Sequence, residues 1–252
     1  MKVFSVAGYT KSGKTTTIEE VIQVLRSRNY SVGSVKDIHF EAFKMDQEGT
    51  NTDRHRKAGS QLITARGLHE TDILFQRQLD LYEIAKFYEV DYLVVEGIRD
   101  ANVPMILTAD CQKDLNERWN DHVFAVSGKI ADQIEDYRGL PAISAMDQAE
   151  KLVDLIERKV FDLLPDFPYD CCHACGGTCR ELGVSILKGE KDRADCVLDQ
   201  SAVRLTINGN PIPMVPFVQN ILKNAVMGVV QELEGFQEEP SIKVELGPAW
   251  KK

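Results

Sequence analysis

VFSVAGYTKSGKTTTIEEV, residues 3–21, decides the fold of this chain. It begins with apolar and β-branched residues, passes through Gly8 and Gly13, and continues with apolar residues at helical spacing. The stretch from Gly8 to Thr15 fits G-x-x-x-x-G-K-[ST], a phosphate loop between a strand and a helix. The glycines let the loop curl so that its N–H groups point at phosphate oxygens, next to the positive helix N-terminus. The stretch therefore predicts an α/β fold that binds a nucleotide.

The side chains of this loop have expected tasks. Lys14 is expected to reach the β and γ phosphates, and the Thr15 hydroxyl to complete a Mg2+ site. The residues expected to contact the nucleotide are Gly8, Thr10, Lys11, Ser12, Gly13, Lys14, Thr15 and Thr16. The motif leaves ATP and GTP open. Residues 108–114, TADCQKD, match only in part the N/T-K-x-D segment that recognises guanine. Residues 125–129, AVSGK, could supply backbone contacts to a guanine carbonyl, and they fit a plain strand end equally well.

Two acidic residues lie at the expected ends of strands. Glu96 follows the apolar run DYLVV, and Asp37 follows SVGSVK. At the carboxyl edge of a parallel sheet, such an acid can hold the magnesium ion or orient water, so we assign both to the Mg2+ site and Lys14 and Glu96 to catalysis of hydrolysis. The alternative for either acid is a helix cap or a solvated carboxylate.

β-branched apolar runs alternate with segments of helical spacing up to about residue 165, which is typical of a doubly wound, mainly parallel P-loop sheet. The expected strands are 2–8, 31–36, 91–97, 104–109, 122–128 and 141–144, and the expected helices are 15–29, 54–65, 79–89 and 146–164. Prolines then predict a boundary, and two short strands around Asn208-Gly209 precede a helix from Pro216. We therefore expect a P-loop domain over 1–165, a cysteine-rich segment over 166–199 and a small β-β-α unit over 200–252.

The composition excludes several classes of protein. The chain has 252 residues, of which 43% are hydrophobic and 27% are charged, and its formal net charge is -9. Such an acidic chain is not expected to bind nucleic acid as its main partner, because that affinity comes from lysines and arginines on phosphates. No apolar run is long enough for a signal peptide or a membrane span. We expect a cytoplasmic protein.

Cysteines cluster near the far end of the chain. Cys172, Cys175 and Cys179 form C-x2-C-x3-C, and Cys196 follows sixteen residues later. Cys171 is an alternative ligand to Cys172. In a reducing compartment, clustered cysteines are more often metal ligands than disulfides. Four thiolates suit either a 4Fe-4S cluster or zinc, and three cysteines in one tight loop favour the cluster.

The stretch from Ser34 to Ser60, SVKDIHFEAFKMDQEGTNTDRHRKAGS, resembles the molybdopterin-guanine dinucleotide biosynthesis protein B family. The residues that carry the resemblance are Lys36, His39, Asp46, Gly49, Arg54, His55, Arg56, Ala58 and Gly59. YLVVEGIRD is similar to the family's strand ending in Glu-Gly before a basic residue, here Arg99. The chain departs from the pattern at Asp37, where relatives often have histidine, and at Asn51, where aspartate is usual.

The resemblance implies a GTP-binding accessory protein and weak GTPase, often a homodimer. It would assist the guanylyltransferase that joins guanosine monophosphate to molybdopterin and would serve apo molybdo- or tungstoenzymes. Candidate residues for a phosphate or the pterin are His39, Arg54, His55, Arg56 and Arg99. Arg54 to Arg56 are expected to open a helix, where cations oppose the dipole unless an anion compensates them. The alternative is a solvated basic face.

The segment from Cys172 to Cys196 is similar to a small 4Fe-4S domain of redox and corrinoid proteins. Cys172, Cys175, Cys179 and Cys196 match its ligands, with one residue fewer between the second and third cysteines. The resemblance implies an iron-sulfur cluster, and zinc is the alternative. Two other functions stay open: a nucleotide-gated metal or cluster chaperone, and a small-molecule kinase with a structural zinc site.

Overall fold

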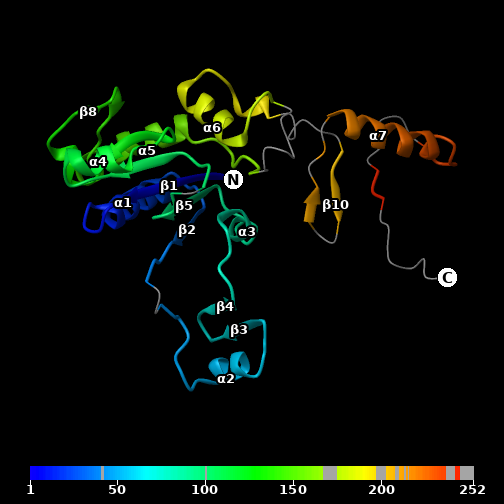
Figure 1. Cartoon of the computed structure of the whole chain (residues 1–252), viewed down its shortest axis with the longest axis horizontal. Helices are drawn as coiled ribbons and strands as arrows, with labels where there is room; N and C mark the ends of the chain where they lie inside the picture. Colours follow the sequence, from blue (N-terminus) through cyan, green and yellow to red (C-terminus); the bar gives the residue numbers. More distant parts are fainter. Residues whose placement is uncertain are drawn as a thin grey trace. The chain divides into compact units, whose positions relative to one another are not determined.

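The computed structural model describes nine stretches of the chain: 1–40, 43–99, 101–166, 175–196, 203–207, 210–212, 214, 216–236 and 242–244. These residues belong to two compact units. The first holds Met1–Asp166 and Cys179–Asp195, and the second holds Phe167–Thr178 and Cys196–Lys252 (Figure 1). Within the described stretches, none of the helices combines the length and the hydropathy that a bilayer crossing requires.

A five-stranded sheet forms the centre of the first unit. Its order is β2 (Val32–Lys36), β5 (Tyr92–Glu96), β1 (Lys2–Gly8), β6 (Met105–Thr108) and β7 (Val123–Ser127). All four pairings are parallel, which confirms the predicted sheet. The carboxyl ends of these strands therefore meet at one edge, and β1 lies in the middle of that edge.

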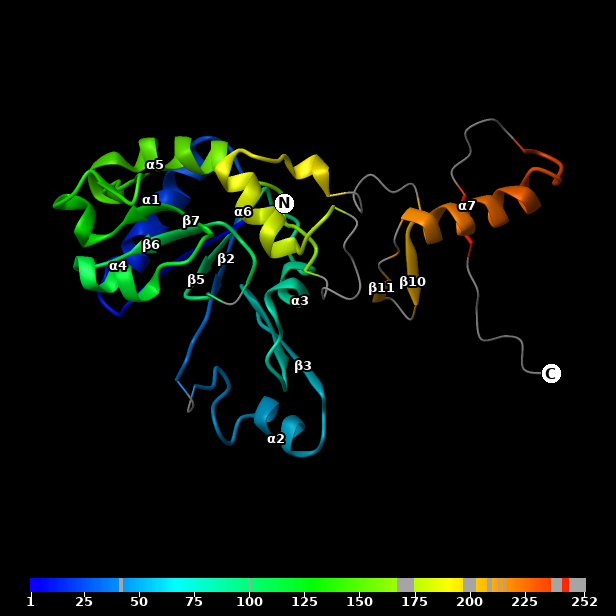
Figure 2. The ribbon, with the colours of Figure 1, turned by 45° about the horizontal axis from the view of Figure 1, so that its top comes forward.

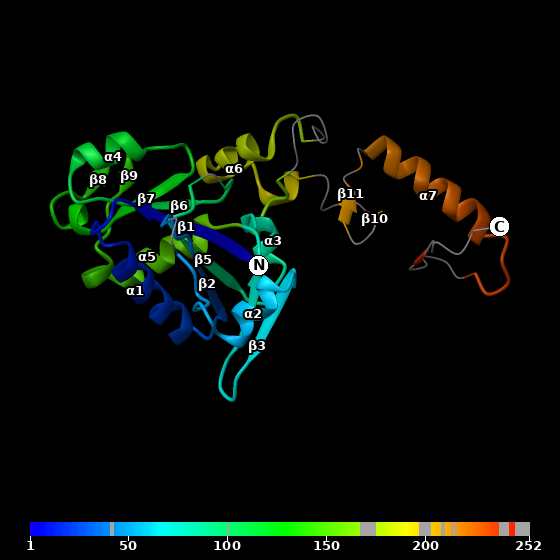
Figure 3. The ribbon, with the colours of Figure 1, turned by 60° about the horizontal axis from the view of Figure 1, so that its bottom comes forward.

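Helices cover both faces of the sheet. α1 (Lys14–Ser27) packs against α5 (Ala145–Lys159), and Figure 3 shows the two side by side. α3 (Leu81–Ala85) and α4 (Gln112–Arg118) contribute to two hydrophobic clusters that take alternate residues of β1, Val3 and Ala7. Because side chains alternate along a strand, α3 and α4 lie on the same face of the sheet.

Arg28, at the carboxyl end of α1, fixes the contact between α1 and α5. Its guanidinium pairs with Glu150, with Asp154 at 2.8 Å and with Glu157 at 2.9 Å, three carboxylates along α5. The hydrogen bonds that the guanidinium donates to these carboxylates, to Glu150 first, raise its pKa. One cation shared by three acids holds two helices that are more than a hundred residues apart in sequence.

The predicted helix over residues 54–65 is confirmed only for residues 54–57 and is wrong for the rest. α2 covers Asn51–Lys57, and the chain then forms β3 (Leu62–Arg66), which pairs antiparallel with β4 (Thr71–Phe75). Gly59 separates the helix from the strand, because its φ of 102° lies where other residues are strained. The β3–β4 hairpin and α2 lie apart from the central sheet (Figures 1 and 2).

The three basic residues also do not open a helix. Arg54, His55 and Arg56 lie in the last turn of α2, where the dipole favours cations and no anion is required. Thr50 caps the start of the helix by accepting a hydrogen bond from the Asp53 N–H at 3.2 Å. The expectation that a bound anion must compensate this run is therefore wrong.

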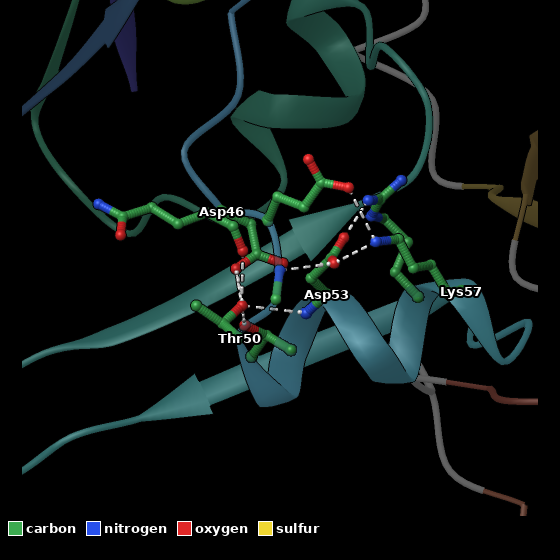
Figure 4. A network of polar contacts seen from close by, with 9 residues as sticks. Asp46, Thr50, Asp53 and Lys57 are labelled. Atoms are coloured by element: carbon green, nitrogen blue, oxygen red, sulfur yellow. Dashed lines mark hydrogen bonds and ion pairs between the residues drawn. The ribbon is translucent and has the colours of Figure 1, made fainter.

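Asp53 organises the segment around α2 (Figure 4). Its side chain is only 2% exposed, accepts the Gly49 N–H at 3.0 Å, and pairs with Arg56 and with Lys57, the latter at 2.8 Å. Hydrogen bonds from Lys57, Gly49 and Arg56 hold the pKa of this carboxyl far below its usual range. The buried charge is therefore compensated on several sides.

The predicted helix over residues 146–164 ends early. α5 stops at Lys159, Val160 is extended, and Asp162 forms an antiparallel bridge to Lys2. The predicted strand at residues 141–144 is reduced to the two-residue β9 (Leu140–Pro141), which pairs with β8 (Asp136–Tyr137), and a parallel bridge from Ala142 to β7. Both differences come from pairing with strands of the central sheet, Asp162 with Lys2 and Ala142 with Val126. The spacing of apolar residues along the chain does not predict such pairing.

The helix α6 (Cys179–Lys188) is part of the first unit, and Figure 2 shows it beside the end of α5. Lys159 donates to the Leu187 carbonyl at 2.7 Å, which satisfies the end of α6. His122, at the start of β7, is 1% exposed, and its Nε2 has no partner among the described residues. Gly183 of α6 lies next to this imidazole, since a Cβ at its position would lie 3.5 Å from the nitrogen, an ordinary contact distance.

The second unit contains a hairpin and a helix. β10 (Leu205–Ile207) pairs antiparallel with β11 (Asn210–Ile212), and α7 covers Pro216–Val230. Two strands followed by a helix were expected here, and the Asn208-Gly209 turn itself lies outside the described residues. The Gln219 side chain is buried and donates to the Met214 carbonyl at 2.7 Å, which ties the start of α7 to the chain before it.

We predict that His122 makes stability fall in mild acid. Burial first, then Arg180, lowers its pKa to about 4, against a weaker opposing effect of Asp121. Between about pH 6.5 and pH 4 the unfolded chain binds a proton at His122 that the folded chain does not bind. The free energy of unfolding therefore decreases by about 3 kcal/mol as the pH is lowered through this range. Urea unfolding from pH 7.5 to 4 measures this loss.

His122→Leu is the comparison for this prediction. The variant lacks the imidazole, so the wild-type chain should lose about 3 kcal/mol more than the variant across the same pH range. Parallel curves for the two proteins would contradict the assignment to His122.

Candidate functional site

The phosphate loop lies at the carboxyl edge of the sheet, between β1 and α1. Gly13 has φ 99° and precedes α1 without any side-chain cap, which leaves the first N–H groups of the helix for a ligand. Lys11 has φ 67°, a left-handed conformation that is uncommon for residues other than glycine. Such strain is typical of loops shaped for binding rather than for stability.

Three glycines let the backbone pack closely behind the loop. A Cβ at Gly8 would lie 2.2 Å from the Thr108 carbonyl oxygen, and one at Gly128 would lie 2.1 Å from the Ser12 carbonyl oxygen. Gly13 lies directly against Gly128, with 3.0 Å from its Cβ position to the Gly128 Cα. The Ser12 hydroxyl shares a 2.7 Å hydrogen bond with Thr108. The ends of β6 and β7 therefore hold the loop in place.

Lys14 lies along the inside of the loop. Its Nζ donates to the Tyr9 carbonyl at 2.6 Å and to the Gly8 carbonyl at 3.1 Å. Burial lowers the pKa of this ammonium, Glu96 opposes the shift, and the neighbouring cations Arg118 and Lys36 lower the pKa further. Positive charge therefore accumulates here, as in a site built for an anion.

Glu96 is the acid that the structure brings to the loop. The Thr15 hydroxyl donates to its Oε1 at 3.2 Å, and Lys36 Nζ lies 3.3 Å from each carboxylate oxygen. Lys36 and Glu96 face each other in the register of β2 and β5. The Thr15 hydroxyl and the Glu96 carboxylate, both expected at the Mg2+ site, therefore lie together, and Lys36 is the ion-pair partner of Glu96.

Asp37 extends β2 beside Glu96. Its N–H donates to the Glu96 carbonyl at 2.9 Å, and its carboxylate lies 3.3 Å from His39 Nε2. The His39 side chain is 72% exposed and the Asp37 side chain 20%, so solvent reaches the pair mainly at the histidine. Asp37 and His39 thus lie at the same edge as the phosphate loop.

The other basic candidates lie elsewhere. Arg54 and His55 are exposed on α2, and Arg56 forms an ion pair with Asp53. These three belong to the segment that hangs away from the sheet, so the structure does not bring them to the phosphate loop (Figures 1 and 2). Arg99, which follows Glu96 after two residues, is exposed.

The two guanine-recognition segments form ordinary local structure. Asp114 accepts the Asp110 N–H at 3.2 Å at the start of α4, and Lys113 lies 3.8 Å from Glu117. Lys129, after β7, pairs with Asp110 at 3.2 Å. These side chains are engaged with each other, and the segments identify no base.

Only part of the cysteine cluster is described. Cys179 begins α6 and is 8% exposed, Cys196 is 4% exposed, and the Cys175 sulfur lies 3.6 Å from the Gly177 carbonyl oxygen. Cys171, Cys172 and His173 lie outside the described residues. Among the residues that are described, no group of three or more His, Cys, Asp or Glu side chains could hold a metal ion.

Sequence reasoning missed Tyr9, Arg118 and Gly128. The Arg118 guanidinium stacks over the Tyr9 ring, and Gly128 supports Ser12 from another strand. Their separation along the chain hides both contacts, although the glycine directly after an apolar strand was a signal for a close backbone approach.

Comparison with known families and proteins gives a consistent result. The sequence model of the family described as "Molybdopterin guanine dinucleotide synthesis protein B" matches residues 3–128. The chain is 30% identical over 253 residues to the "Putative molybdopterin-guanine dinucleotide biosynthesis adapter protein" of Methanocaldococcus jannaschii, covering 98% of this chain and 97% of that protein. It is 27% identical to the "Probable molybdopterin-guanine dinucleotide biosynthesis adapter protein" of Bacillus subtilis, covering 58% of this chain and 86% of the relative.

Solved structures support the fold. The crystal structure of Bacillus subtilis MobB superposes with a TM-score of 0.53 at 24% identity, covering 65% of this chain and 100% of that one. This similarity agrees with the parallel sheet and its helices.

We predict that Gly128→Ala weakens nucleotide binding more than Gly139→Ala. Both glycines have positive φ, 75° and 78°, so alanine strains the backbone at both. Only at Gly128 does the new Cβ meet an atom, the Ser12 carbonyl oxygen at 2.1 Å, which must push the phosphate loop away. We expect the Kd for a magnesium nucleoside triphosphate to rise about tenfold or more in Gly128→Ala alone. Equal Kd values in calorimetry would contradict this support role.

Proposed function

Because the chain belongs to the molybdopterin-guanine dinucleotide synthesis protein B family, we propose that it is a GTP-binding adapter in the biosynthesis of that cofactor. Two similar proteins are described as biosynthesis adapter proteins. An adapter must bind something and present it to an enzyme. The edge of the sheet around the phosphate loop is the part of this chain that supports such a task.

The observation that carries the proposal is the charge balance at Lys14. The cations Arg118 and Lys36 each act on the Lys14 ammonium, and Glu96 is the carboxylate that opposes them. A triphosphate would supply the missing negative charge, with the uncapped start of α1 and the Lys14 ammonium as its donors. Thr15, Glu96 and Asp37 would offer oxygen ligands to an accompanying Mg2+, which would neutralise part of the phosphate charge.

Guanine is proposed on the chemistry of the pathway. The cofactor named in the family description contains a guanine nucleotide, and GTP is the activated form of its guanylyl group. An adapter that holds GTP would present this group to the guanylyltransferase. We further propose slow GTP hydrolysis, in which Lys14 stabilises the charge on the phosphates and Glu96 orients water.

The proposed partners are the guanylyltransferase, apo molybdo- or tungstoenzymes and a second copy of this chain. Large apolar side chains are exposed on the segment between β2 and β4: Phe40 at 71%, Met45 at 72% and Leu68 at 97%. Apolar side chains of this size tend to be covered by a partner. The homodimer therefore has a candidate surface on the same segment as α2.

For the cysteine segment, we propose a 4Fe-4S cluster held by Cys172, Cys175, Cys179 and Cys196, with zinc as the alternative. Thiolates are the ligands that such clusters require, and Cys179 begins a ten-residue helix, where the dipole stabilises a thiolate. Cys179 and Cys196 are buried, as ligands shielded from solvent should be. A bound cluster would supply one-electron chemistry or a structural staple.

We predict that Lys14→Ala abolishes measurable GTP binding. The variant loses the ammonium that faces the phosphates, so the Kd for Mg·GTP in calorimetry should rise about 100-fold or more. Lys151→Ala is the control, because this lysine is exposed on α5 and donates to Gln148 of the same helix at 3.3 Å. Wild-type protein that binds Mg·ATP but not Mg·GTP would overturn the guanine assignment, and binding of neither would overturn the adapter's nucleotide site.

We predict that the protein purified without oxygen contains about four irons per chain and absorbs broadly in the visible range. Cys179→Ser and Cys196→Ser should each lower the iron content, whereas Cys111→Ser should not, because Cys111 is exposed at the start of α4. A colourless protein with one zinc per chain would replace the cluster by a zinc site. A protein without either metal would overturn both.

A further inference from the structure

Arg118 lies at the last position of α4 and reaches the phosphate loop through Tyr9. Its guanidinium carbon lies 3.7 Å from the centre of the Tyr9 ring, which is close stacking for a cation on an aromatic face. The Tyr9 hydroxyl donates to Glu117 Oε2 at 2.7 Å. Two neighbouring residues of α4 therefore hold the Tyr9 side chain from both its face and its hydroxyl.

Tyr9 marks one end of the phosphate site. The Lys14 ammonium lies against the Tyr9 carbonyl at 2.6 Å, and in such loops this ammonium serves the β and γ phosphates. Thr15, whose hydroxyl donates to Glu96 Oε1 at 3.2 Å, lies on the β5 side of the loop, where the oxygen ligands for Mg2+ are expected, and α4 follows β6 on the opposite side of β1. Arg118 is thus positioned beside the part of the loop where the terminal phosphate of a nucleotide is expected.

The guanidinium of Arg118 has N–H groups without an acceptor among the described residues. In the described part of the chain it makes no hydrogen bond or ion pair, and its Nε is buried without a partner. Arg28, Arg56 and Arg77, in contrast, each pair with carboxylates. Stacking on Tyr9 occupies a face of the guanidinium plane and leaves its N–H edge available. A buried donor without an acceptor costs free energy, which an arriving anion would relieve.

We propose that Arg118 donates from this edge to the terminal phosphate of a bound nucleoside triphosphate and so makes the site prefer triphosphate to diphosphate. The inference rests on the proposed nucleotide site and adds a specificity-determining residue to it. Because the stack on Tyr9 already orders the side chain, little conformational entropy is lost when the phosphate binds. A planar guanidinium can place two N–H groups on one phosphate, which a lysine cannot do.

The experiment compares triphosphate with diphosphate. Calorimetry gives the Kd of full-length protein for magnesium complexes of GDP and of a GTP analogue with a nitrogen bridge between its last two phosphates, with the adenine pair in parallel. Arg118→Gln should raise the Kd of the triphosphate about 10- to 100-fold and change the Kd of the diphosphate less than about threefold. Arg118→Lys, which keeps the charge without the planar fork, should give an intermediate loss of preference.

Arg138→Gln is the matched control. Arg138 also stacks on aromatic rings, 4.9 Å from the centre of Trp119 and 5.5 Å from that of Tyr137, and is exposed. This variant should leave both Kd values unchanged. Thermal unfolding of each variant without nucleotide reports any general loss of structure.

Two outcomes overturn the inference in different ways. Equal weakening of triphosphate and diphosphate binding by Arg118→Gln, or no weakening of either, would make Arg118 a support for Tyr9 and leave the nucleotide site standing. Wild-type protein that binds neither nucleotide would overturn the site itself, and the inference with it.

Discussion

The contact between the Ser12 carbonyl and the Gly128 backbone is the constraint on which the candidate site depends. A loop of small residues has no core of its own, so its shape must come from the strands behind it. The ends of β6 and β7 supply this support, through Thr108 and Gly128, and no side chain larger than hydrogen fits at the point of closest approach. The sheet thus transmits its rigidity to the N–H groups that would face a phosphate.

A second consequence of the sheet order is the placement of charge. β1 is flanked by β5 and β6, so Glu96 and the segment leading to α4 arrive on opposite sides of the phosphate loop. Glu96, Lys36 and Asp37 gather on one side, and Arg118 lies on the other. The strand order therefore separates oxygen ligands suited to a metal from a cation suited to a phosphate.

The sequence was informative where structure is local. The phosphate loop, the parallel strands and Glu96 follow from spacing and composition, because a strand buried on both faces and a glycine-rich turn leave clear patterns. The hairpin of β3 and β4 was missed because LITA satisfies helical spacing as well as it satisfies a short strand, and only pairing with Thr71–Phe75 decides between them. Arg118 was missed because its stacking partner lies far away along the chain. The metal ligands stay a prediction, since Cys172 lies outside the described residues.

The network around Asp53 has a consequence for how the molecule opens. Its hydrogen bonds and ion pairs join residues that are at most nine positions apart, between Asp46 and Lys57. Closing such short loops loses little chain entropy, and the residues that these bonds join lie outside the five strands of the central sheet. Residues 46–57, together with β3 that packs against α2, can therefore open locally and exchange amide hydrogens or be cut by a protease while the phosphate loop stays folded. Amide protection or protease resistance of residues 46–57 then does not report whether the phosphate loop is folded.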